Sequence, residues 1–334
     1  MAKLLKLIQN EWMKLWQKKS TWVMVLLLFL IVPGMMGLMK WLHGLDDRVD
    51  SQTQNGVIEI QVESEEASYD WKVVVENELA YIQERLNAKD LSKVELQELE
   101  GKEKILEYRL ANSIEPLETP SRESMMTDTS GFTSIVLLFT VVVAAGIVAA
   151  EFSQGTIKML LSRPVRRWKI LTSKFVTVNM FSALLILIGY LLSVSFSYLL
   201  FQTGDGQLLS WNGQEVVETS ILGKSVYMLA LSFGSVFVTS TFAFMIGVVF
   251  RSSSMAIGLS IFLYFTGTSI VLMLERFSIT KYLVFTHMDL TQYGTGYKII
   301  EDISMPFSLM VLSVYIVVFL VTSYWTFIQR DVKA

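Results

Sequence analysis

The sequence predicts an all-α integral membrane protein with six transmembrane helices and a mainly helical insertion between the first and second of them. The chain contains six apolar runs, each long enough to cross about 30 Å of hydrocarbon as a helix. Apolar residues make up 52% of the chain and charged residues 18%, and the mean hydropathy is +0.46. The segments that join the apolar runs alternate between mainly basic and mainly acidic, which is typical of a multi-pass membrane protein.

The six apolar runs are separated by polar segments of very different length. Pro33 interrupts the first run and predicts a kink in that helix. Small residues fill the end of the second run, which predicts that this end packs closely against other helices. The predicted spans are residues 21–42, 131–150, 176–201, 226–250, 255–274 and 307–328.

The first 20 residues predict an amphipathic interfacial helix rather than a signal peptide. The apolar run that follows is too long for a signal core and lacks a small-residue cleavage site. Lysines lie largely off the apolar stripe, so such a helix can lie at an anionic membrane surface. This helix can serve as a membrane anchor or as a contact with a partner subunit. Both roles require similar residues, so the sequence is consistent with either. The stripe contains Leu4, Leu5, Ile8, Trp12, Leu15 and Trp16.

Residues 43–129 predict a polar domain built on a helical hairpin. Residues 57–62 alternate weakly, as in a short strand. Apolar residues then recur at spacings of three and four, first in one helix and then, after a polar break, in a second. The first stripe contains Trp71, Val75, Leu79, Ile82 and Leu86, and the second contains Leu99, Leu106 and Leu110.

The distribution of charge predicts the orientation. Residues 1–20, 151–175, 251–254 and 329–334 together carry 14 of the 28 Lys and Arg but three of the 31 acidic residues. One side of the membrane is therefore +11 and the other −14. Short basic connections stay in the cytoplasm, so both termini are expected there, with residues 43–129 and 275–305 outside.

Several kinds of chemistry are disfavoured. The chain has no cysteine and two histidines, His43 and His287, which we expect to be exposed loop residues rather than metal ligands. No charged residue lies deep within a predicted span, which argues against ion-coupled carriers and intramembrane hydrolases. Serines and threonines in the spans are expected to bond within or between helices more often than to a substrate. No nucleic-acid partner and no directly bound cofactor are expected.

Residues 151–175, between the second and third spans, form a basic connection with an ordered pattern. Gly155 and Pro164 bracket a short apolar-periodic piece that predicts a helix at the membrane surface. Glu151 follows the second span, where it can tie the connection to a nearby Lys or Arg, for example through the first helix. A plain loop that only sets orientation is the alternative. The pattern comprises Glu151, Phe152, Gly155, Thr156, Leu160, Leu161, Arg163, Pro164 and Arg166.

This pattern resembles the signature of the ABC type-2 permease family, the membrane subunits of ATP-driven exporters. The resemblance implies that the segment after the second span is a coupling helix that docks on an ATPase subunit. It also implies a bacterial cytoplasmic membrane location, a second permease subunit, and ATP and Mg²⁺ used by the partner rather than by this chain. In this family residues 275–305 often correspond to a re-entrant helix.

Two functions of different class follow. The first is the permease subunit of an exporter of amphipathic, peptide-like (antimicrobial peptide) or lipid-like substrates, because the span walls are apolar. The second is a membrane receptor or sensor whose outer helical domain binds a ligand. The small cytoplasmic segments leave no room for a signalling enzyme, which counts against the second function.

Overall fold

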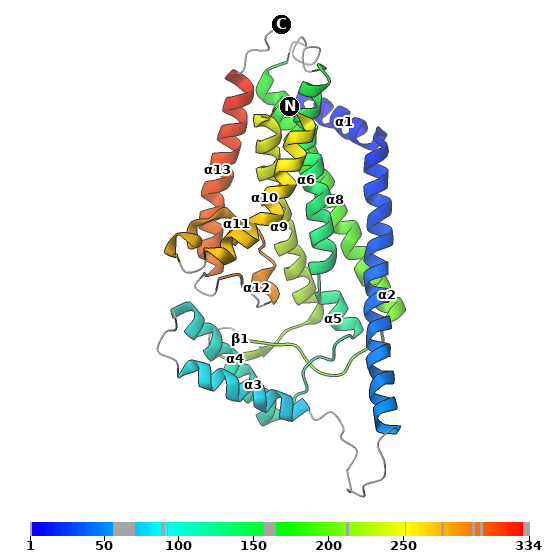
Figure 1. The fold of residues 1–334 in the computed structure, drawn as a ribbon, viewed down its shortest axis with the longest axis vertical. Helices are drawn as coiled ribbons and strands as arrows, with labels where there is room; N and C mark the ends of the chain where they lie inside the picture. The colour runs from blue at the N-terminus through cyan, green and yellow to red at the C-terminus, as the bar shows by residue number, and fades with distance from the viewer. Residues whose placement is uncertain are drawn as a thin grey trace, which may run out of the picture. The chain divides into compact units, whose positions relative to one another are not determined.

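Helices dominate the computed structural model, which describes residues 2–55, 71–87, 91, 93–156, 165–211, 214–250, 252–274, 277–295, 298–300 and 303–329 (Figure 1). Six helices in this part of the chain are long and apolar enough to cross a membrane, so the protein is an all-α membrane protein. They are α2 (Lys19–Asn55), α6 (Ser130–Ser153), α8 (Arg167–Leu200), α9 (Ile221–Val249), α10 (Ser253–Met273) and α13 (Met305–Gln329).

The six helices confirm the number of predicted apolar helices but move three boundaries, one of which is the start of α9 at Ile221 instead of residue 226. Helix α2 continues through Pro33 and on to Asn55, because no proline or glycine stands between residues 45 and 55 to end it. Helix α8 begins at Arg167, well before the predicted start at residue 176, so the second half of the basic connection is helical. This shift places Lys174 within a helix instead of a loop.

Contacts divide the chain into two compact units. Unit 1 contains residues 1–31, 129–191 and 227–334, and unit 2 contains residues 32–128 and 192–226. The division falls inside α2, α8 and α9.

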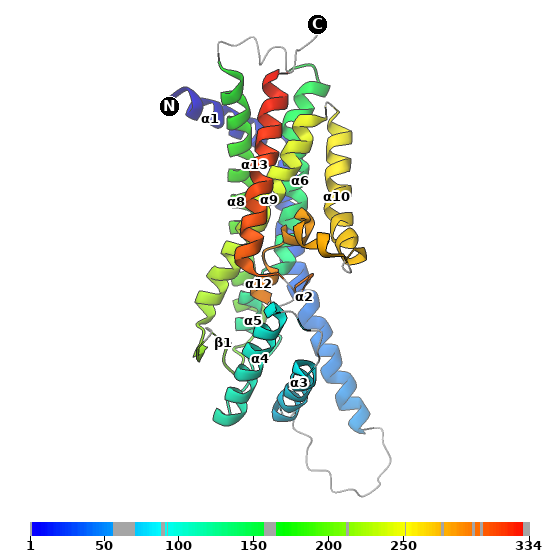
Figure 2. The same ribbon diagram turned by 90° about the vertical axis from the view of Figure 1, so that its left-hand side faces the viewer.

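Close packing of small residues holds the centre of unit 1. Ala144, Ala145 and Ala149 of α6 are fully buried, as their size predicted. A Cβ at Gly247 of α9 would lie 2.2 Å from the carbonyl oxygen of Ala145, so only glycine permits this approach of two backbones. Helix α10 packs along α6 (Figure 2).

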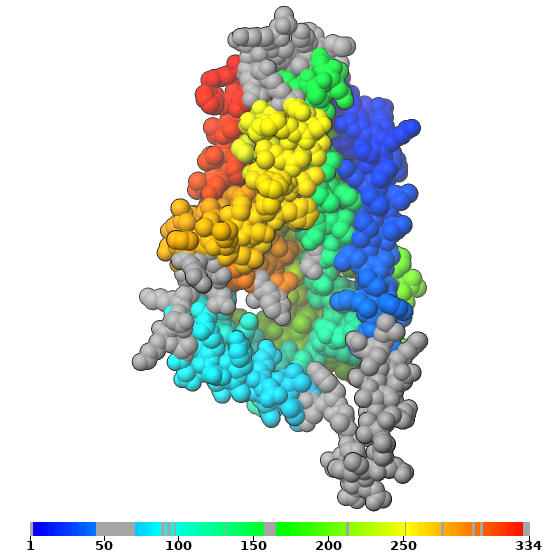
Figure 3. Space-filling model, in the orientation of Figure 1, coloured from blue at the N-terminus to red at the C-terminus, as the bar shows by residue number. Residues whose placement is uncertain are grey.

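The outer face of α10 is apolar and open, as expected for a helix in contact with lipid. Figure 3 shows this helix in yellow on the surface of the molecule. Met255, Phe262, Phe265 and Leu272 are each more than half exposed. Such large apolar side chains on the surface of a helix are stable in hydrocarbon and costly in water.

Most of the described polar side chains within the helices of unit 1 bond to one another or to backbone, as predicted, whereas the buried hydroxyl of Ser260 in α10 has no partner. Ser240 donates to Oδ1 of Asn179 at 2.8 Å, which links α9 to α8. Thr239 and Thr241 donate to carbonyls of their own helix at 2.8 Å. Each of these three hydroxyls is thereby satisfied without water.

Residues 277–295 form three short helical pieces: η1 (Ser278–Tyr282), α11 (Val284–His287) and α12 (Gln292–Thr295). Helix α11 packs against α10 and α13. The expectation that His287 is an exposed loop residue is wrong, because its side chain is fully buried. His43 is exposed, as expected, but it lies within helix α2 and not in a loop. Insertion of this segment into the membrane stays a prediction.

A two-helix hairpin forms the core of unit 2 and confirms the predicted pairing of stripes. Helices α3 (Trp71–Leu86) and α4 (Lys93–Asn112) bury Val75 and Ile82 against Leu106. Arg85 and Glu95 join the two helices by an ion pair of 2.9 Å. The strand predicted at residues 57–62 lies outside the described residues.

Unit 2 also contains a small sheet that the sequence did not predict. Strands β1 (Leu209–Trp211) and β2 (Val216–Glu218) pair antiparallel, between the predicted spans 176–201 and 226–250. Trp211 packs against Gly101 of α4, where a Cβ would come within 2.9 Å of the indole ring. The short helix α5 (Arg122–Thr127) begins at Ser121, which caps it with a reciprocal hydrogen bond to Ser124.

Candidate functional site

The amphipathic N-terminal helix α1 (Ala2–Gln17) forms as predicted and packs on the bundle of unit 1. Leu15 is buried, and the ring of Trp16 lies edge-on to Phe181 of α8 with centroids 6.2 Å apart. Trp12 stacks edge-on against Trp16 at 5.8 Å. Leu15 and Trp16 therefore anchor α1 to protein, whereas Trp12 contacts Trp16 of the same helix. Helix α2 begins two residues after α1 ends.

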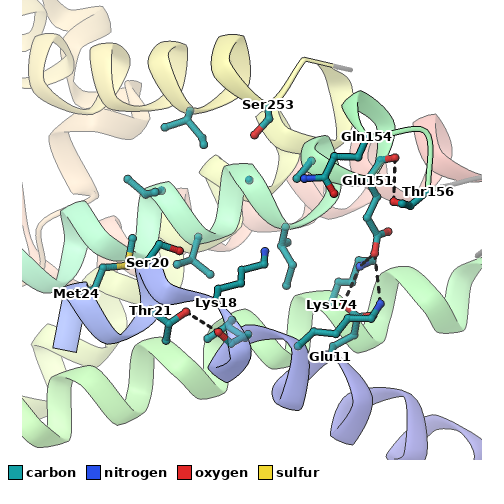
Figure 4. A pocket seen from close by; sticks show the side chains of 18 residues that line it. Glu11, Lys18, Ser20, Thr21, Met24, Glu151, Gln154, Thr156, Lys174 and Ser253 are labelled. Carbon is teal, nitrogen blue, oxygen red and sulfur yellow. Dashed lines mark hydrogen bonds and ion pairs between the residues drawn. The ribbon is translucent and has the colours of Figure 1, made fainter. Parts of the chain in front are cut away.

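A charged cluster joins α1, the end of α6 and the first turns of α8. The side chain of Lys174 is 1% exposed, and its Nζ lies 2.7 Å from Oε2 of Glu11 and 2.6 Å from Oε1 of Glu151 (Figure 4). We name Glu11, Lys174 and Glu151 the junction triad. Hydrogen bonds between full charges are about twice as strong as neutral ones, so the triad is a firm link between three helices.

Lys14 of α1 completes the charge balance at the edge of the triad. Its Nζ lies 2.9 Å from Oε1 of Glu11 and 3.7 Å from Oε1 of Glu151, and its side chain is 53% exposed. Burial raises the pKa of Glu11, but the attraction and hydrogen bonds of Lys174 and Lys14 outweigh burial and hold that pKa below its ordinary value. Glu11 is therefore ionised at neutral pH.

Two members of the triad were not predicted as site residues, although the sequence carries a signal for both. Glu11 stands three residues after Ile8 and four before Leu15, on the apolar stripe of α1. Lys174 likewise stands three residues after Leu171 and four before Val178, and both of these are fully buried. A charged residue on an apolar helical face must find an opposite charge when that face is buried.

A cavity of about 600 Å³ opens beside the triad. Lys14, Lys18, Glu151 and Lys174 line its charged end, and the walls continue along α2, α6 and α10. Figure 4 shows the side chain of Lys18 extending into this space. Pockets of this size hold small ligands or parts of larger ones.

The nine residues of the predicted coupling pattern fall into two groups. Glu151 and Phe152 end α6, and Phe152 packs edge-on against Phe327 of α13 with centroids 6.4 Å apart. Gly155 has a φ of +72°, which favours glycine and turns the chain away from the helix. Thr156 donates to the carbonyl of Glu151 at 3.4 Å, and Arg166 is exposed just before α8. Leu160, Leu161, Arg163 and Pro164 lie outside the described residues.

Among the residues whose placement is described, no group of three His, Cys, Asp or Glu side chains can hold a metal ion. The charged groups of the site pair with one another instead. The arrangement is suited to linking helices and to binding a charged ligand beside them, and it holds no nucleophile with an adjacent base.

Fold and site together define a class: a helical membrane protein whose N-terminal amphipathic helix is locked by buried ion pairs to two of its apolar helices. The chain belongs to the DUF2705 family, described as a protein of unknown function, whose pattern matches residues 107–333.

Two relatives from Bacillus subtilis strain 168 extend this assignment. The uncharacterized protein YhcI is 32% identical, and the alignment covers 98% of this chain and 99% of YhcI. The uncharacterized membrane protein YdbK is 32% identical over 58% of this chain and 76% of its own length. The similarity to YhcI includes the N-terminal third of the chain, where α1 and Glu11 lie.

Proposed function

We propose that this protein is the permease subunit of an ATP-driven ABC exporter in the bacterial cytoplasmic membrane. It spans the membrane six times, has both termini in the cytoplasm, and works with ATPase subunits and a second permease subunit. ATP and Mg²⁺ act on the ATPase and not on this chain. The substrate class that suits apolar span walls is amphipathic, peptide-like or lipid-like.

The junction triad is the observation that carries the proposal. A permease must pass a movement of the docked ATPase to its transmembrane helices. Segment 151–166 begins in the last turn of α6 and ends just before α8, and Lys174 ties both helices to Glu11 of α1. A force on this segment thus reaches two apolar helices and the surface helix through short, buried ion pairs.

The coupling role is tested by purifying the tagged chain from its bacterial host and measuring which ATPase is retained. Leu160→Asp should reduce ATPase retention at least about tenfold, because buried apolar anchors carry most of the energy of an interface. Ser162→Asp, which adds the same charge next to the apolar face, is the matched control and should retain the ATPase. If no ATPase accompanies the wild-type chain, or if Leu160→Asp retains it fully, the permease proposal is wrong.

A second variant separates assembly from transmission. Glu151→Gln keeps the size of the side chain but removes the charge that Lys174 binds at 2.6 Å. The complex should still assemble, while the amount of substrate moved per ATP hydrolysed falls. Unchanged coupling in Glu151→Gln would remove the triad from the transport mechanism.

The orientation is tested by cysteine labelling, which is clean because the chain has no cysteine of its own. Single cysteines at Ser92 and Ser210 should react with an impermeant reagent added to intact cells. A cysteine at Ser253 should react only after the membrane is opened. The reverse pattern would invert the proposed topology.

A further inference from the structure

The cavity beside the junction triad has one charged end and one apolar end. Its apolar wall is formed by Met24 of α2, Val143 and Ile147 of α6, and Ile257 of α10. Ser20, Gln154 and Ser253 add neutral polar groups near the charged end. A soluble ion would leave the apolar wall uncovered, and a pure hydrocarbon would leave the polar groups without partners. The lining therefore suits an amphiphile.

The charges at the cavity do not cancel. Three lysines (Lys14, Lys18 and Lys174) face two glutamates (Glu11 and Glu151). Both glutamates bind Lys174, and both also lie within 4 Å of Lys14. Among the described residues, Nζ of Lys18 makes no ion pair. One positive charge is thus left over, and it projects into the cavity (Figure 4).

The surroundings of Lys18 disfavour a bare ammonium group. Although its surface remains accessible, burial by neighbouring atoms lowers the pKa of Lys18. Repulsion from Lys174 lowers the pKa further, and Glu11 and Glu151 oppose the change. An anion placed between Lys18 and the polar groups would relieve this repulsion.

The position of Lys18 along the chain indicates where such an anion comes from. The apolar stretch that can cross a membrane begins at Lys19, so Lys18 lies at the level where α2 enters the hydrocarbon. Lysines at this level commonly bind lipid phosphates. The apolar wall continues from there along α2, α6 and α10, in the direction that an acyl chain would follow.

We propose that this cavity binds one anionic phospholipid, with its phosphodiester on Lys18 and the start of an acyl chain along Met24, Val143, Ile147 and Ile257. The single negative charge of a phosphodiester matches the single unpaired lysine. The proposal is independent of the exporter function, because it requires neither an ATPase nor a transported substrate. It assigns to this part of the structure a resident lipid that fills the gap between α2, α6 and α10.

The test uses the full chain, purified in a neutral detergent, stripped of lipid and then incubated with phosphatidylglycerol or phosphatidylcholine. Native mass spectrometry should find one phosphatidylglycerol per chain, bound at least about tenfold more tightly than phosphatidylcholine, because the choline ammonium cancels the phosphodiester charge and would be repelled by the lysines of the cavity. Lys18→Gln should abolish this preference. Lys19→Gln makes the same change of charge one residue away, at an exposed position outside the cavity lining, and should keep the preference.

Two further probes separate a lipid from a free anion. Millimolar inorganic phosphate should leave the bound phosphatidylglycerol in place, and glycerol phosphate, which has no acyl chain, should compete poorly. Displacement by inorganic phosphate would reassign the cavity to a free phosphate and overturn the lipid site. An equal loss in Lys18→Gln and Lys19→Gln would reduce the effect to general surface charge, which also overturns the proposal.

Discussion

Two buried cations, one in each unit of the molecule, are stabilised in different ways. Lys174 in unit 1 lies 2.7 and 2.6 Å from the carboxylates of Glu11 and Glu151. Arg109 in unit 2, which is 8% exposed, donates to the backbone carbonyls of Glu115 and Gln207, each at 2.9 Å. Lys174 therefore neutralises two negative charges in part, whereas Arg109 donates hydrogen bonds to uncharged backbone carbonyls.

The difference matters because of what is left when each cation is removed. Without Lys174, the carboxylates of Glu11 and Glu151 are left close together without the cation between them, and burial already disfavours the charge of Glu11. Without Arg109, two carbonyls lose a donor but carry no net charge. Burial lowers the pKa of Arg109, and Glu78 opposes that change, so this guanidinium remains charged. Lys174 should therefore matter more to stability than Arg109.

The largest expected effect is that of Lys174→Met, which should destabilise unit 1 by about 3–5 kcal/mol, the scale for breaking a buried ion pair from one side. Thermal unfolding in detergent, followed by tryptophan fluorescence, to which Trp12 and Trp16 beside the triad contribute, measures this loss. Lys14→Met is the matched control and should cost at most about 1 kcal/mol, because the Lys14 side chain is largely exposed.

The double variant Lys174→Met with Glu11→Gln sharpens this prediction. Removing one carboxylate removes the repulsion that the first change creates, so the double variant should be more stable than Lys174→Met alone. If instead the two losses add, the triad is three separate contacts and the comparison with Arg109 fails.

The intermediate effect is that of Arg109→Met, which should cost about 1.5–3 kcal/mol, the scale of hydrogen bonds from a charged group, because it removes the two bonds that the guanidinium donates. The loss should be local, so hydrogen exchange should increase at the amide of Gln207, which donates to the carbonyl of Glu115 at 3.0 Å. Lys104→Met on the same helix is the control, since its ion pair with Glu107 is exposed. A larger loss for Arg109→Met than for Lys174→Met would reverse the comparison.

The smallest effect concerns His287, a buried base without a carboxylate partner in the described contacts. Its Nε2 donates to the carbonyl of Lys281 at 2.7 Å and its Nδ1 accepts from Ser308 at 2.5 Å, while Tyr293 also bonds to the Ser308 hydroxyl. Burial lowers the pKa of His287, and the bond to the Lys281 carbonyl opposes that change. The folded protein therefore holds this ring neutral.

Because the pKa is lower in the folded state, the unfolded state binds more protons as the pH falls below the ordinary value of 6.5. Stability is thus complete above that value and falls below it, by at most about 1.4 kcal/mol at pH 5.5. Hydrogen exchange of residues 281–287 at pH 7.5 and 5.5 measures the change. His287→Asn should abolish the pH dependence of exchange, and His43→Asn, at an exposed position, should not. An identical pH dependence in both variants would show that it does not arise from His287.

Local pattern in the sequence was enough to predict the helices. The six apolar runs became six long helices because a backbone in hydrocarbon must satisfy its own hydrogen bonds. The stripes through Ile82 and Leu106 became the hairpin of unit 2 because each helix has one apolar face to bury. The closely packed end of α6 and the turn at Gly155 also followed from residue size and from the freedom of glycine.

The partners of buried polar groups were decided only by the tertiary structure. Glu151 was expected to meet a nearby Lys or Arg, but Lys174 entered the site only because α8 starts at Arg167 and turns that residue inward. Glu11 and Lys174 are far apart in sequence and meet because two apolar faces pack together. His287 became buried for the same reason, when α11 packed against α13. The periodicity of apolar residues shows which face of a helix is buried. Which group pairs with a buried charge depends on which other helix packs against that face.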